Sequence, residues 1–403
     1  MRRFAVTLLL VSWLASPLPA DEPRLPARGW EPANHALLER WLGQVAARPQ
    51  GQDAARKVAV FDFDNTLIFH DCGEATFRHQ LAALRFRVTP QQLGELIPAA
   101  HGEVTALRDG TPLADVREDL LTAYAQLWPR IAAGEQEAVR ESEAARDLRA
   151  KMLWFYDEAY DTPGIGARYA YPLLARLLAG FTPEEVGGLA RAAVDMARAE
   201  EPGRGSWESA TPGKVGRRTH GFYRGLRAQA EMIDLVRALT AAGVECYVVS
   251  ASAEPIVEAT AAHLGYPFDP ARVFGIRVAQ DEQGRLTTRD VEGYPLTWRQ
   301  GKVDLIRQEL RAEPLLVAGD TFTDYEMLVA FPTTEVRLLI NRNKCQDELA
   351  PLYRDGAAAG ARAPAAGRPR VLLQGRDEPQ GRFRPHLLTI PLGETEPRTL
   401  PPG

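Results

Sequence analysis

The feature that most constrains this chain is a short apolar run that ends in two aspartates. Residues 58–61, Val-Ala-Val-Phe, lead directly into Asp62 and Asp64. An uninterrupted apolar run is typical of a strand in a parallel sheet that is covered on both faces. In open α/β sheets, ligands bind beyond the carboxyl ends of the strands, so both carboxylates are expected where chemistry takes place. Taken alone, the same pattern also fits an acidic turn exposed to solvent, so the rest of the chain must decide.

Further apolar runs alternate with helical segments in the second half of the chain. Strands are expected at residues 244–250, 273–278, 314–318 and 335–340, and helices at 229–242, 255–264 and 301–310. This alternation predicts βαβ units and therefore an α/β fold with a Rossmann-like, largely parallel sheet. A hairpin turn is expected around Gln283-Gly284, and an amphipathic helix at residues 34–47 is expected outside the core.

The long segment between the first strand and the later ones has a different pattern. Residues 74–224 are rich in Ala, Leu, Arg and Glu with helical periodicity, which predicts a helical cap domain inserted after the first strand. A loop-like return is expected at residues 201–213. The α/β core is then formed by residues 21–73 and 225–348. Residues 349–403 are expected to be a partly disordered extension, with short extended runs at 371–373 and 386–392 as edge strands.

Polar residues follow the later strands as well. Ser250 and Ala251 end the second strand, where a hydroxyl and free N–H groups at a helix start would bind an anion. Lys302 lies near the start of a helix, and Asp320 and Asp324 follow the fourth strand. Each of these has an ordinary structural explanation alone, as a cap, a turn or a solvated lysine. Together, carboxylates at one sheet edge predict a site for one Mg²⁺, with a lysine and a serine beside it for a phosphoryl group.

These motifs resemble those of the haloacid dehalogenase superfamily. The resemblance is carried by Asp62-Phe63-Asp64-Asn65-Thr66, Ser250, Lys302, and Gly319-Asp320 with Asp324, and the position of the cap is similar to that of the phosphoserine phosphatase-like branch. The resemblance implies that Asp62 is a nucleophile that forms an aspartyl-phosphate. It implies that Asp64 is the general acid and base. The second acid separates the phosphatases of the superfamily from its dehalogenases, so a phosphoric monoester hydrolase is expected.

The resemblance also implies a ligand set. Asp62, the backbone carbonyl of Asp64 and Asp320 would hold Mg²⁺, and Asp324 would support either that site or the lysine. Ser250 and Lys302 would bind the phosphoryl oxygens, with Lys302 also restraining the charge of Asp62. Residues that would also lie against the substrate are Thr66, Glu74 and Ala251.

The substrate is expected to be a small phosphorylated metabolite. Phosphocholine is the first candidate, because the cap carries aromatic residues beside acids, a combination that suits a quaternary ammonium. These aromatic residues are Trp154, Phe155, Tyr156, Tyr160, Tyr169 and Tyr171. Packing within the cap explains most of them equally well. The exported chain and Thr297–Lys302 are also similar to bacterial phosphorylcholine phosphatases. Phosphoserine or a broad range of phosphomonoesters is the alternative, and Asp71 or Glu74 could then meet an amino group. A phosphotransferase and a non-catalytic binding protein are further possibilities from other classes.

The two ends of the chain and its charge bound the remaining possibilities. Met1-Arg2-Arg3, an apolar run and the breaker Ser16 to Ala20 are typical of a signal peptide cleaved after Ala20. An exported bacterial protein, periplasmic or secreted and without a stable membrane anchor, is expected. A net charge of −5 argues against nucleic acid as a partner. The sequence leaves the oligomeric state open. Cys72 and Cys345 are candidates for a disulfide, and Cys246 is expected in the core.

Overall fold

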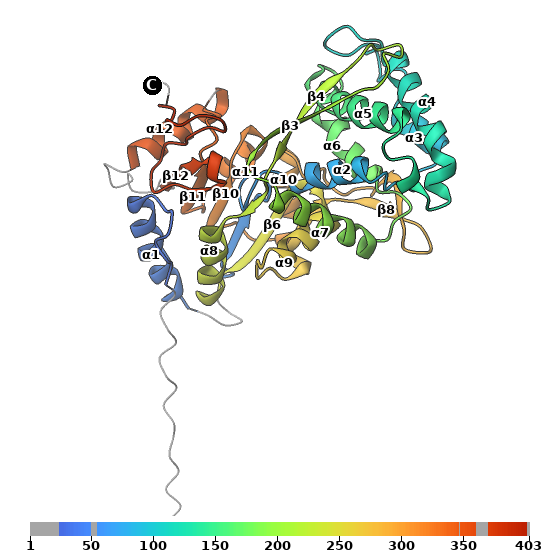
Figure 1. The fold of residues 1–403 in the computed structure, drawn as a ribbon. Helices are drawn as coiled ribbons and strands as arrows, with labels where there is room; N and C mark the ends of the chain where they lie inside the picture. Colours follow the sequence, from blue (N-terminus) through green and yellow to red (C-terminus); the bar gives the residue numbers. More distant parts are fainter. Residues whose placement is uncertain (1–23, 50–54, 346, 360–369, 401–403) are drawn as a thin grey trace, which may run out of the picture.

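The core of the protein is a six-stranded parallel sheet. The computed structural model describes residues 24–49, 55–345, 347–359 and 370–400. Within them the sheet runs in the order β12 (Arg370–Gln374), β11 (Val336–Ile340), β10 (Leu316–Gly319), β1 (Val58–Phe61), β6 (Glu245–Ala253) and β7 (Val273–Ile276). The strand that ends in the two aspartates is therefore central, between β10 and β6 (Figure 1). The predicted α/β, Rossmann-like fold is confirmed.

Both faces of the sheet are covered, which explains why its strands are continuously apolar. Ala59 and Phe61 point into one buried cluster, and Val58 and Val60 point into another on the opposite face. The first face is covered by α1 (Pro32–Ala46), α8 (Ala230–Ala241) and α9 (Glu254–His263). The second is covered by α10 (Gln300–Leu305), α11 (Tyr325–Val329) and α12 (Ala350–Ala359). A strand buried on both faces cannot show the polar alternation of a half-exposed strand.

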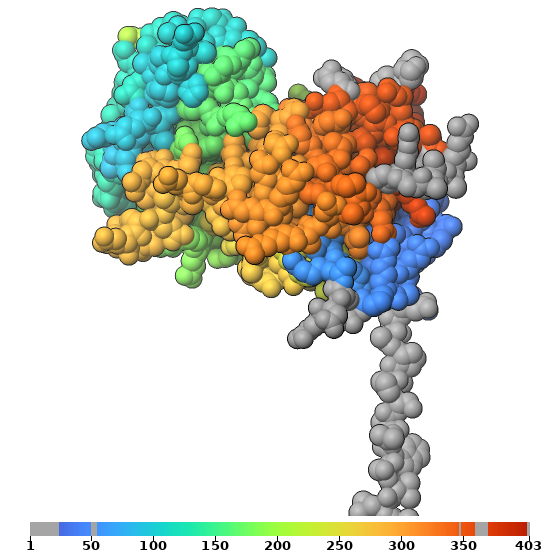
Figure 2. Space-filling view, turned by 180° about the vertical axis from the view of Figure 1, so that it is seen from behind, coloured from blue at the N-terminus to red at the C-terminus, as the bar shows by residue number. Residues whose placement is uncertain are grey.

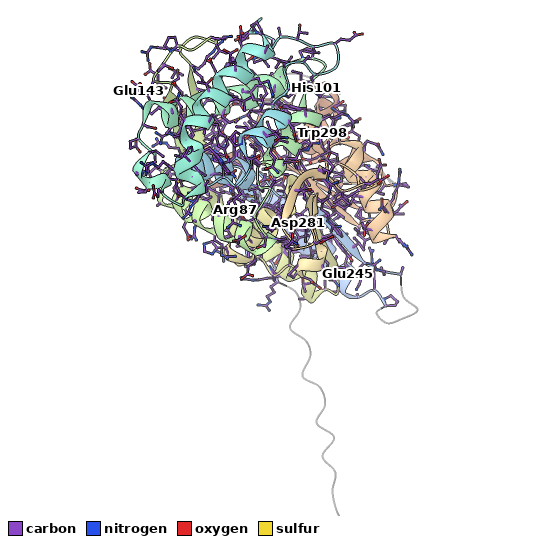
Figure 3. The ribbon with its side chains drawn as sticks, turned by 90° about the vertical axis from the view of Figure 1, so that its right-hand side faces the viewer. Arg87, His101, Glu143, Glu245, Asp281 and Trp298 are labelled. Atoms are coloured by element: carbon purple, nitrogen blue, oxygen red, sulfur yellow. The ribbon has the colours of Figure 1, made fainter. Side chains whose placement is uncertain are left out.

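A second lobe is inserted between β1 and β6 and has its own apolar cluster. Its helices are α3 (Pro90–Leu96), α4 (Leu113–Ala132), α5 (Glu143–Asp161) and α6 (Ala167–Arg176). Two further helices, α2 (Cys72–Ala82) and α7 (Pro183–Ala199), run between this lobe and the core. The space-filling view shows the lobe as a separate mass beside the core (Figure 2). Figure 3 places His101 and Glu143 in this lobe and Glu245 at the far end of the core.

The predicted loop-like return at residues 201–213 is wrong in part. Gly203–Glu208 forms β3, which pairs antiparallel with β4 (Thr219–Arg224). The alternating burial along both strands shows that one face packs against the lobe, where Trp207 and Phe222 lie with ring centroids 5.0 Å apart. The first strand contains glycine, arginine and serine, which have a low preference for strands. Its sequence therefore does not predict a strand, and the strand is stabilised by pairing with β4.

Several short strands complete the described chain. They are β2 (Ile68–Phe69) with β5 (Arg227–Ala228), β8 (Val278–Gln280) with β9 (Leu286–Asp290), and β13 (Arg376–Asp377) with β14 (Arg382–Phe383). The β8–β9 pair is the hairpin predicted around Gln283-Gly284.

The C-terminal part of the chain is integrated into the core. β12 is the edge strand that the run at 371–373 predicts. The run at 386–392 is not a strand, apart from an isolated bridge between Asp377 and Ile390. Its residues instead fold back on the end of the sheet, where Thr389 Oγ1 donates a hydrogen bond to Asn341 O at 2.5 Å. Its leucines and Ile390 are half-buried there without a partner strand, and sequence alone cannot distinguish such a run from an edge strand.

The described cysteines are free, so the structure contains no Cys72–Cys345 disulfide. Cys246 is buried in the core, as predicted. No helix among residues 24–49, 55–345, 347–359 and 370–400 is long and apolar enough to cross a membrane. The predicted signal peptide at residues 1–20 lies outside the described residues.

Candidate active site

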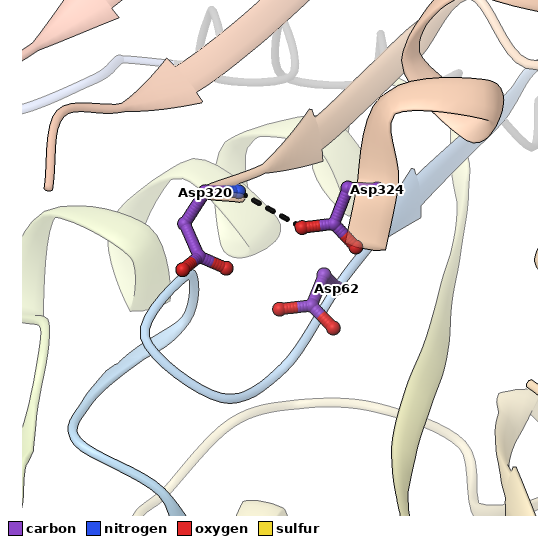
Figure 4. A group of neighbouring side chains, drawn as sticks. All are labelled: Asp62, Asp320 and Asp324. Carbon is purple, nitrogen blue, oxygen red and sulfur yellow. Dashed lines mark hydrogen bonds between the residues drawn. The ribbon is translucent and has the colours of Figure 1, made fainter. Parts of the chain in front are cut away.

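Two adjacent parallel strands, β1 and β10, bring the central carboxylates together. Asp62 follows β1 and Asp320 follows β10, and the N–H of Asp62 donates to Ala318 O at 2.9 Å. One carboxylate oxygen from each of Asp62, Asp320 and Asp324 lies within 4.8 Å of those of the other two (Figure 4). All three residues are buried. The parallel pairing of β1 and β10 therefore places Asp62 and Asp320, more than 250 positions apart in the sequence, at the same edge of the sheet.

Lys302 neutralises part of this negative charge. Its Nζ donates to Asp62 Oδ1 at 2.6 Å and to Asp324 Oδ1 at 2.7 Å, and the residue is 1% exposed. Burial acts to lower the pKa of Lys302, but Asp324 and Asp62 outweigh burial and raise it above its ordinary value. The lysine is therefore a fixed cation that links the first motif to the fourth.

Both carboxylate oxygens of Asp324 accept hydrogen bonds from protein donors. Its Oδ1 accepts from Lys302, and its Oδ2 accepts from the backbone N–H groups of Asp320 and Thr321 at 3.0 and 3.3 Å. Of the two roles expected for it, support of the lysine is the one that these contacts favour. The Asp62 and Asp320 carboxylates are oxygen donors suited to a hard divalent cation, and the resemblance adds the Asp64 carbonyl. This donor set fits Mg²⁺.

Asp64 stands apart from that cluster and has a different environment. Its Oδ1 accepts from Cys72 N at 2.7 Å, and its Oδ2 accepts from Ser252 Oγ at 2.7 Å and Ser250 Oγ at 3.3 Å. Burial raises the pKa of Asp64, although the hydrogen bonds from Cys72 and Ser252 oppose the rise. Asp64 is thus oriented by neutral donors, whereas Asp62 is held by a lysine.

Ser250 does not lie at a helix start, in contrast to the prediction. β6 continues to Ala253, and α9 begins only at Glu254, so Ser250 lies within the strand and its side chain contacts Asp64. The pairing of β6 with β7 shifts register between Val249 and Ala253, and β6 ends three residues beyond the predicted end at Ser250. Ala251 lines the catalytic pocket, together with Ser252.

The remaining predicted substrate contacts divide into two groups. Thr66 is fully buried and donates to Asp320 Oδ1 at 3.1 Å, which makes it a support for that carboxylate. Glu74 lines the catalytic pocket and the adjoining cavity. Glu74 lies between neighbouring elements of the fold. Its side chain faces the cavity and is exposed to solvent there.

Buried acids dominate the electrostatics of this region. Burial raises the pKa of Asp62 well above its ordinary value, and Asp324 raises it further, while Lys302 opposes both. Burial likewise raises the pKa of Asp320, against the guanidinium of Arg342. Burial and the neighbouring Asp64 raise the pKa of Asp71. Burial is the first cause of each shift and neighbouring acids add to it, so a bound cation would favour the ionised forms of these carboxyls.

A larger cavity of about 390 Å³ adjoins the catalytic pocket, whose own volume is about 80 Å³. Asp71, Glu74 and Tyr156 line both, so the two spaces meet at these residues. Asp157 lines the larger cavity and pairs with His220 at 2.5 Å. In the part of the chain that the structure describes, neither Asp71 nor Glu74 forms a salt bridge with Lys, Arg or His.

Only some of the cap aromatic residues reach this region. Tyr156 and Tyr171 line the catalytic pocket. Phe155 and Tyr169 pack in the core of the second lobe, and the face of Trp154 is covered by the Arg218 guanidinium 4.0 Å from its centroid. The packing explanation is therefore the better one for these three residues.

Sequence reasoning missed three residues at the site. Ser252 makes a shorter hydrogen bond to Asp64 than Ser250 does. Arg342 lines the catalytic pocket and contacts Asp320 Oδ2 at 2.7 Å. Arg376, 1% exposed, donates to Asn65 O in the turn of the first motif at 3.2 Å. The position of Arg342 just after the fifth strand was a usable signal, whereas nothing in the sequence around Arg376 separates it from the surrounding arginines.

Comparison with known proteins agrees with this geometry. The family model of haloacid dehalogenase-like hydrolases matches residues 149–329, which include Ser250, Lys302, Asp320 and Asp324 but not the first motif. The match covers less than half of the chain, and it supports the resemblance that the later motifs carry. None of the curated proteins matches the chain at a significant level.

Solved structures add information about the fold. A conserved, functionally unknown protein from Anaerococcus prevotii aligns over 91% of this chain and 98% of its own, with 25% identity and a TM-score of 0.77. A protein of unknown function from Bordetella pertussis covers 75% of this chain and 96% of its own, at 17% identity and a TM-score of 0.42. A substrate-bound phosphoserine phosphatase covers 72% and 87%, at 14% identity and 0.30. The last two scores are too low to support an argument, so the first likeness alone supports the whole-chain architecture.

Proposed function

We propose that the protein is a Mg²⁺-dependent phosphomonoesterase that acts through an aspartyl-phosphate. The observation that carries the proposal is the separation of two carboxylates with different surroundings. Asp62 is held by Lys302 in an acidic cluster, and Asp64 is oriented by hydroxyl and backbone donors beside the pocket. A nucleophile must be charged, and a general acid must hold a proton, so the two roles need different environments.

The first half of the reaction transfers the phosphoryl group to the protein. An oxygen of Asp62 attacks phosphorus, the ester bond breaks, and the leaving oxygen takes a proton from Asp64. Burial raises the pKa of Asp64 and also that of Asp62, so the assignment rests on contacts: Asp62 has a lysine as counter-ion, whereas Asp64 has only neutral donors. Lys302 and Ser250 bind phosphoryl oxygens as charge develops on them.

The second half regenerates the enzyme. Asp64, now ionised, accepts a proton from water, the water oxygen attacks phosphorus, and the bond to Asp62 breaks to release phosphate. Mg²⁺, bound by Asp62, Asp320 and the Asp64 carbonyl, would supply positive charge that stabilises the phosphoryl oxygens. Thr66 keeps Asp320 in place for this purpose through its hydrogen bond to Oδ1.

Phosphocholine is the substrate that we favour. The cavity beside the catalytic pocket is lined by the unpaired acids Asp71 and Glu74 and by the ring of Tyr156. A quaternary ammonium is attracted by carboxylates and by aromatic faces, and it needs no hydrogen-bond acceptor of its own. Phosphoserine, whose amino group would use the same acids, and a broad range of small phosphomonoesters remain the alternatives.

The test is phosphate release by the mature chain from Asp21, with p-nitrophenyl phosphate, phosphocholine and phosphoserine as substrates. Turnover should require Mg²⁺, stop with EDTA, and fall by at least about 10³-fold in Asp62→Asn. A kcat/KM for phosphocholine well above that for phosphoserine supports the substrate assignment. Turnover that persists in Asp62→Asn contradicts the mechanism, and equal values for all three substrates favour the broad-range alternative.

Two other functional classes predict different outcomes. A phosphotransferase would form the same intermediate but pass the phosphoryl group to an added alcohol, so phosphorylated alcohol would appear at the expense of phosphate. A non-catalytic binding protein would hold phosphocholine without turnover. The presence of both Asp62 and Asp64 at the pocket favours the hydrolase.

We also propose that the protein is exported, on the basis of residues 1–20. Expression of the full chain in a bacterium, followed by fractionation and N-terminal sequencing, should give a mature protein that begins at Asp21. Recovery of the uncleaved chain in the cytosol contradicts the proposal.

A further inference from the structure

Arg342 contacts the catalytic cluster from a part of the chain that the four motifs do not include. It lies two residues beyond β11, with Nη1 2.7 Å from Asp320 Oδ2. Its side chain is 23% exposed and that of Asp320 is 3% exposed, so the guanidinium forms one wall of the catalytic pocket. Burial acts to lower the pKa of Arg342, but Asp320 outweighs burial and raises it, which keeps the charge fixed at +1.

The C-terminal segment holds the backbone of Arg342 in place. The preceding residue, Asn341, is fully buried; its N–H donates to Gln374 O and its Nδ2 donates to Leu387 O, both at 2.8 Å. Its carbonyl accepts from Thr389 Oγ1. Glu378 and Glu74 also act electrostatically on Arg342, but Glu378 is paired with Arg376, and the salt bridge of Arg342 is with Asp320. Arg342 is therefore committed to Asp320.

Arg342 and a divalent cation would depend on the same carboxylate. Both oxygens of Asp320 already have partners, with Thr66 Oγ1 on Oδ1 and Arg342 on Oδ2. The carboxylates of Asp62, Asp320 and Asp324 lie close together, and Lys302 and Arg342 are the cations that contact them. Removal of Arg342 would make the net charge around these carboxylates more negative by one. Like charges sharing one carboxylate repel, so a guanidinium there weakens the attraction for a cation.

We propose that Arg342 is a positioning counter-ion of Asp320 that orders this carboxylate before metal binding and lowers the affinity of the site for a divalent cation. The inference rests on the metal dependence in the proposed function but on no particular substrate. Charge is expected to outweigh loss of order when Arg342 is removed. The reason is that Thr66 Oγ1 still holds the side chain of Asp320, and Asp324 still accepts from its N–H.

The experiment measures Mg²⁺ binding to the metal-free mature chain by calorimetry, without substrate. Arg342→Gln should bind Mg²⁺ about tenfold more tightly than the wild type, because one nearby positive charge is lost. Arg342→Lys keeps the charge and should bind within about twofold of the wild type. Thermal unfolding in EDTA checks that each variant is folded, and Arg342→Gln should unfold at a lower temperature than the wild type.

A matched control is available at the other end of the same strand. Arg48 contacts Glu335, the residue before β11, at 2.8 Å, so Arg48→Gln also removes one arginine from a carboxylate without touching the site. Its Mg²⁺ affinity should equal that of the wild type.

The outcomes separate this inference from the proposed function. Mg²⁺ binding by Arg342→Gln that is equal to or weaker than that of the wild type overturns the role of Arg342 and leaves the metal dependence standing. A tenfold change in the Mg²⁺ affinity of Arg342→Lys also overturns the role of Arg342. This second test applies even if Arg342→Gln does not fold. A wild-type chain that binds neither Mg²⁺ nor Mn²⁺ overturns the metal dependence and this inference together.

Discussion

Replacing Lys302 with methionine tests whether the acidic cluster is held together by its lysine. The change removes two charge-assisted hydrogen bonds, of 2.6 Å to Asp62 and 2.7 Å to Asp324, while keeping a side chain of similar length. Breaking a buried ion pair by removing one partner costs about 3–5 kcal/mol, because the remaining charge loses its counter-ion. Two carboxylates lose theirs here, so the free energy of unfolding should fall by at least about 3 kcal/mol at pH 7.5 in EDTA.

The loss of stability in Lys302→Met should depend on pH. The pKa of Asp62 in the folded chain is already raised well above its ordinary value, and loss of Lys302 must raise it further. A carboxyl with a raised folded-state pKa binds more protons in the folded than in the unfolded chain, so its contribution to stability falls as pH rises. The deficit of Lys302→Met should therefore be smaller at pH 5.5 than at pH 7.5.

Urea unfolding followed by far-UV circular dichroism at the two pH values is the assay. The double variant Lys302→Met/Asp324→Asn removes one of the two unpaired charges and should recover part of the loss. A deficit below about 1 kcal/mol at pH 7.5, or one that grows on acidification, would refute the reasoning.

Three further predictions concern Asp64, Glu74 and the connection between the two lobes. Asp64→Asn should fold like the wild type but lose about 10²–10⁴-fold in p-nitrophenyl phosphate turnover, and an unchanged turnover would exclude Asp64 as acid and base. The pKa of Glu74 is raised to about 7, by burial first and then by Asp157, so ionisation above pH 7 should lower the KM for phosphocholine between pH 6 and 8. That trend should exceed the one for p-nitrophenyl phosphate and disappear in Glu74→Gln; if it survives the substitution, Glu74 does not bind the cation. Gly225 has φ +88°, and a Cβ there would lie 2.4 Å from Pro202 N. Gly265 has a similar φ of +82°, but a Cβ there would meet no atom within 4 Å. Gly225→Ala should therefore lower the unfolding temperature more than Gly265→Ala. Equal losses in the two alanine variants would show that the close contact is relieved without cost.

Much of the core could be predicted from the sequence because its signals are local. An apolar run buried on both faces identifies β1 wherever its neighbours lie, and the turn residues after it identify where the strand ends. The alternation of such runs with helical segments predicts parallel strands, and parallel strands place their carboxyl ends at one edge. Asp62, Lys302, Asp320 and Asp324 could therefore be grouped before their distances were known.

The second lobe shows where local signals fail. Helical periodicity predicted its helices, but the β3–β4 pairing depends on contacts between residues 203–208 and 219–224 that no single strand announces. The aromatic residues of the lobe look alike in sequence, and only packing separates Tyr156, which lines the pocket, from Trp154, whose face is covered by Arg218.

The sequence by itself determined the class of fold, the strand-end acids and the lysine, because each depends on residue type and on position within one element. The tertiary structure alone decided that Asp324 serves Lys302, that Ser252 joins Ser250 on Asp64, and that Arg342 contacts Asp320. It also decided that the C-terminal segment, expected to be partly disordered, places Arg376 beneath the first motif. The physical reason is that a hydrogen bond or ion pair depends on atomic distances, and the distances between elements are set by packing rather than by spacing along the chain.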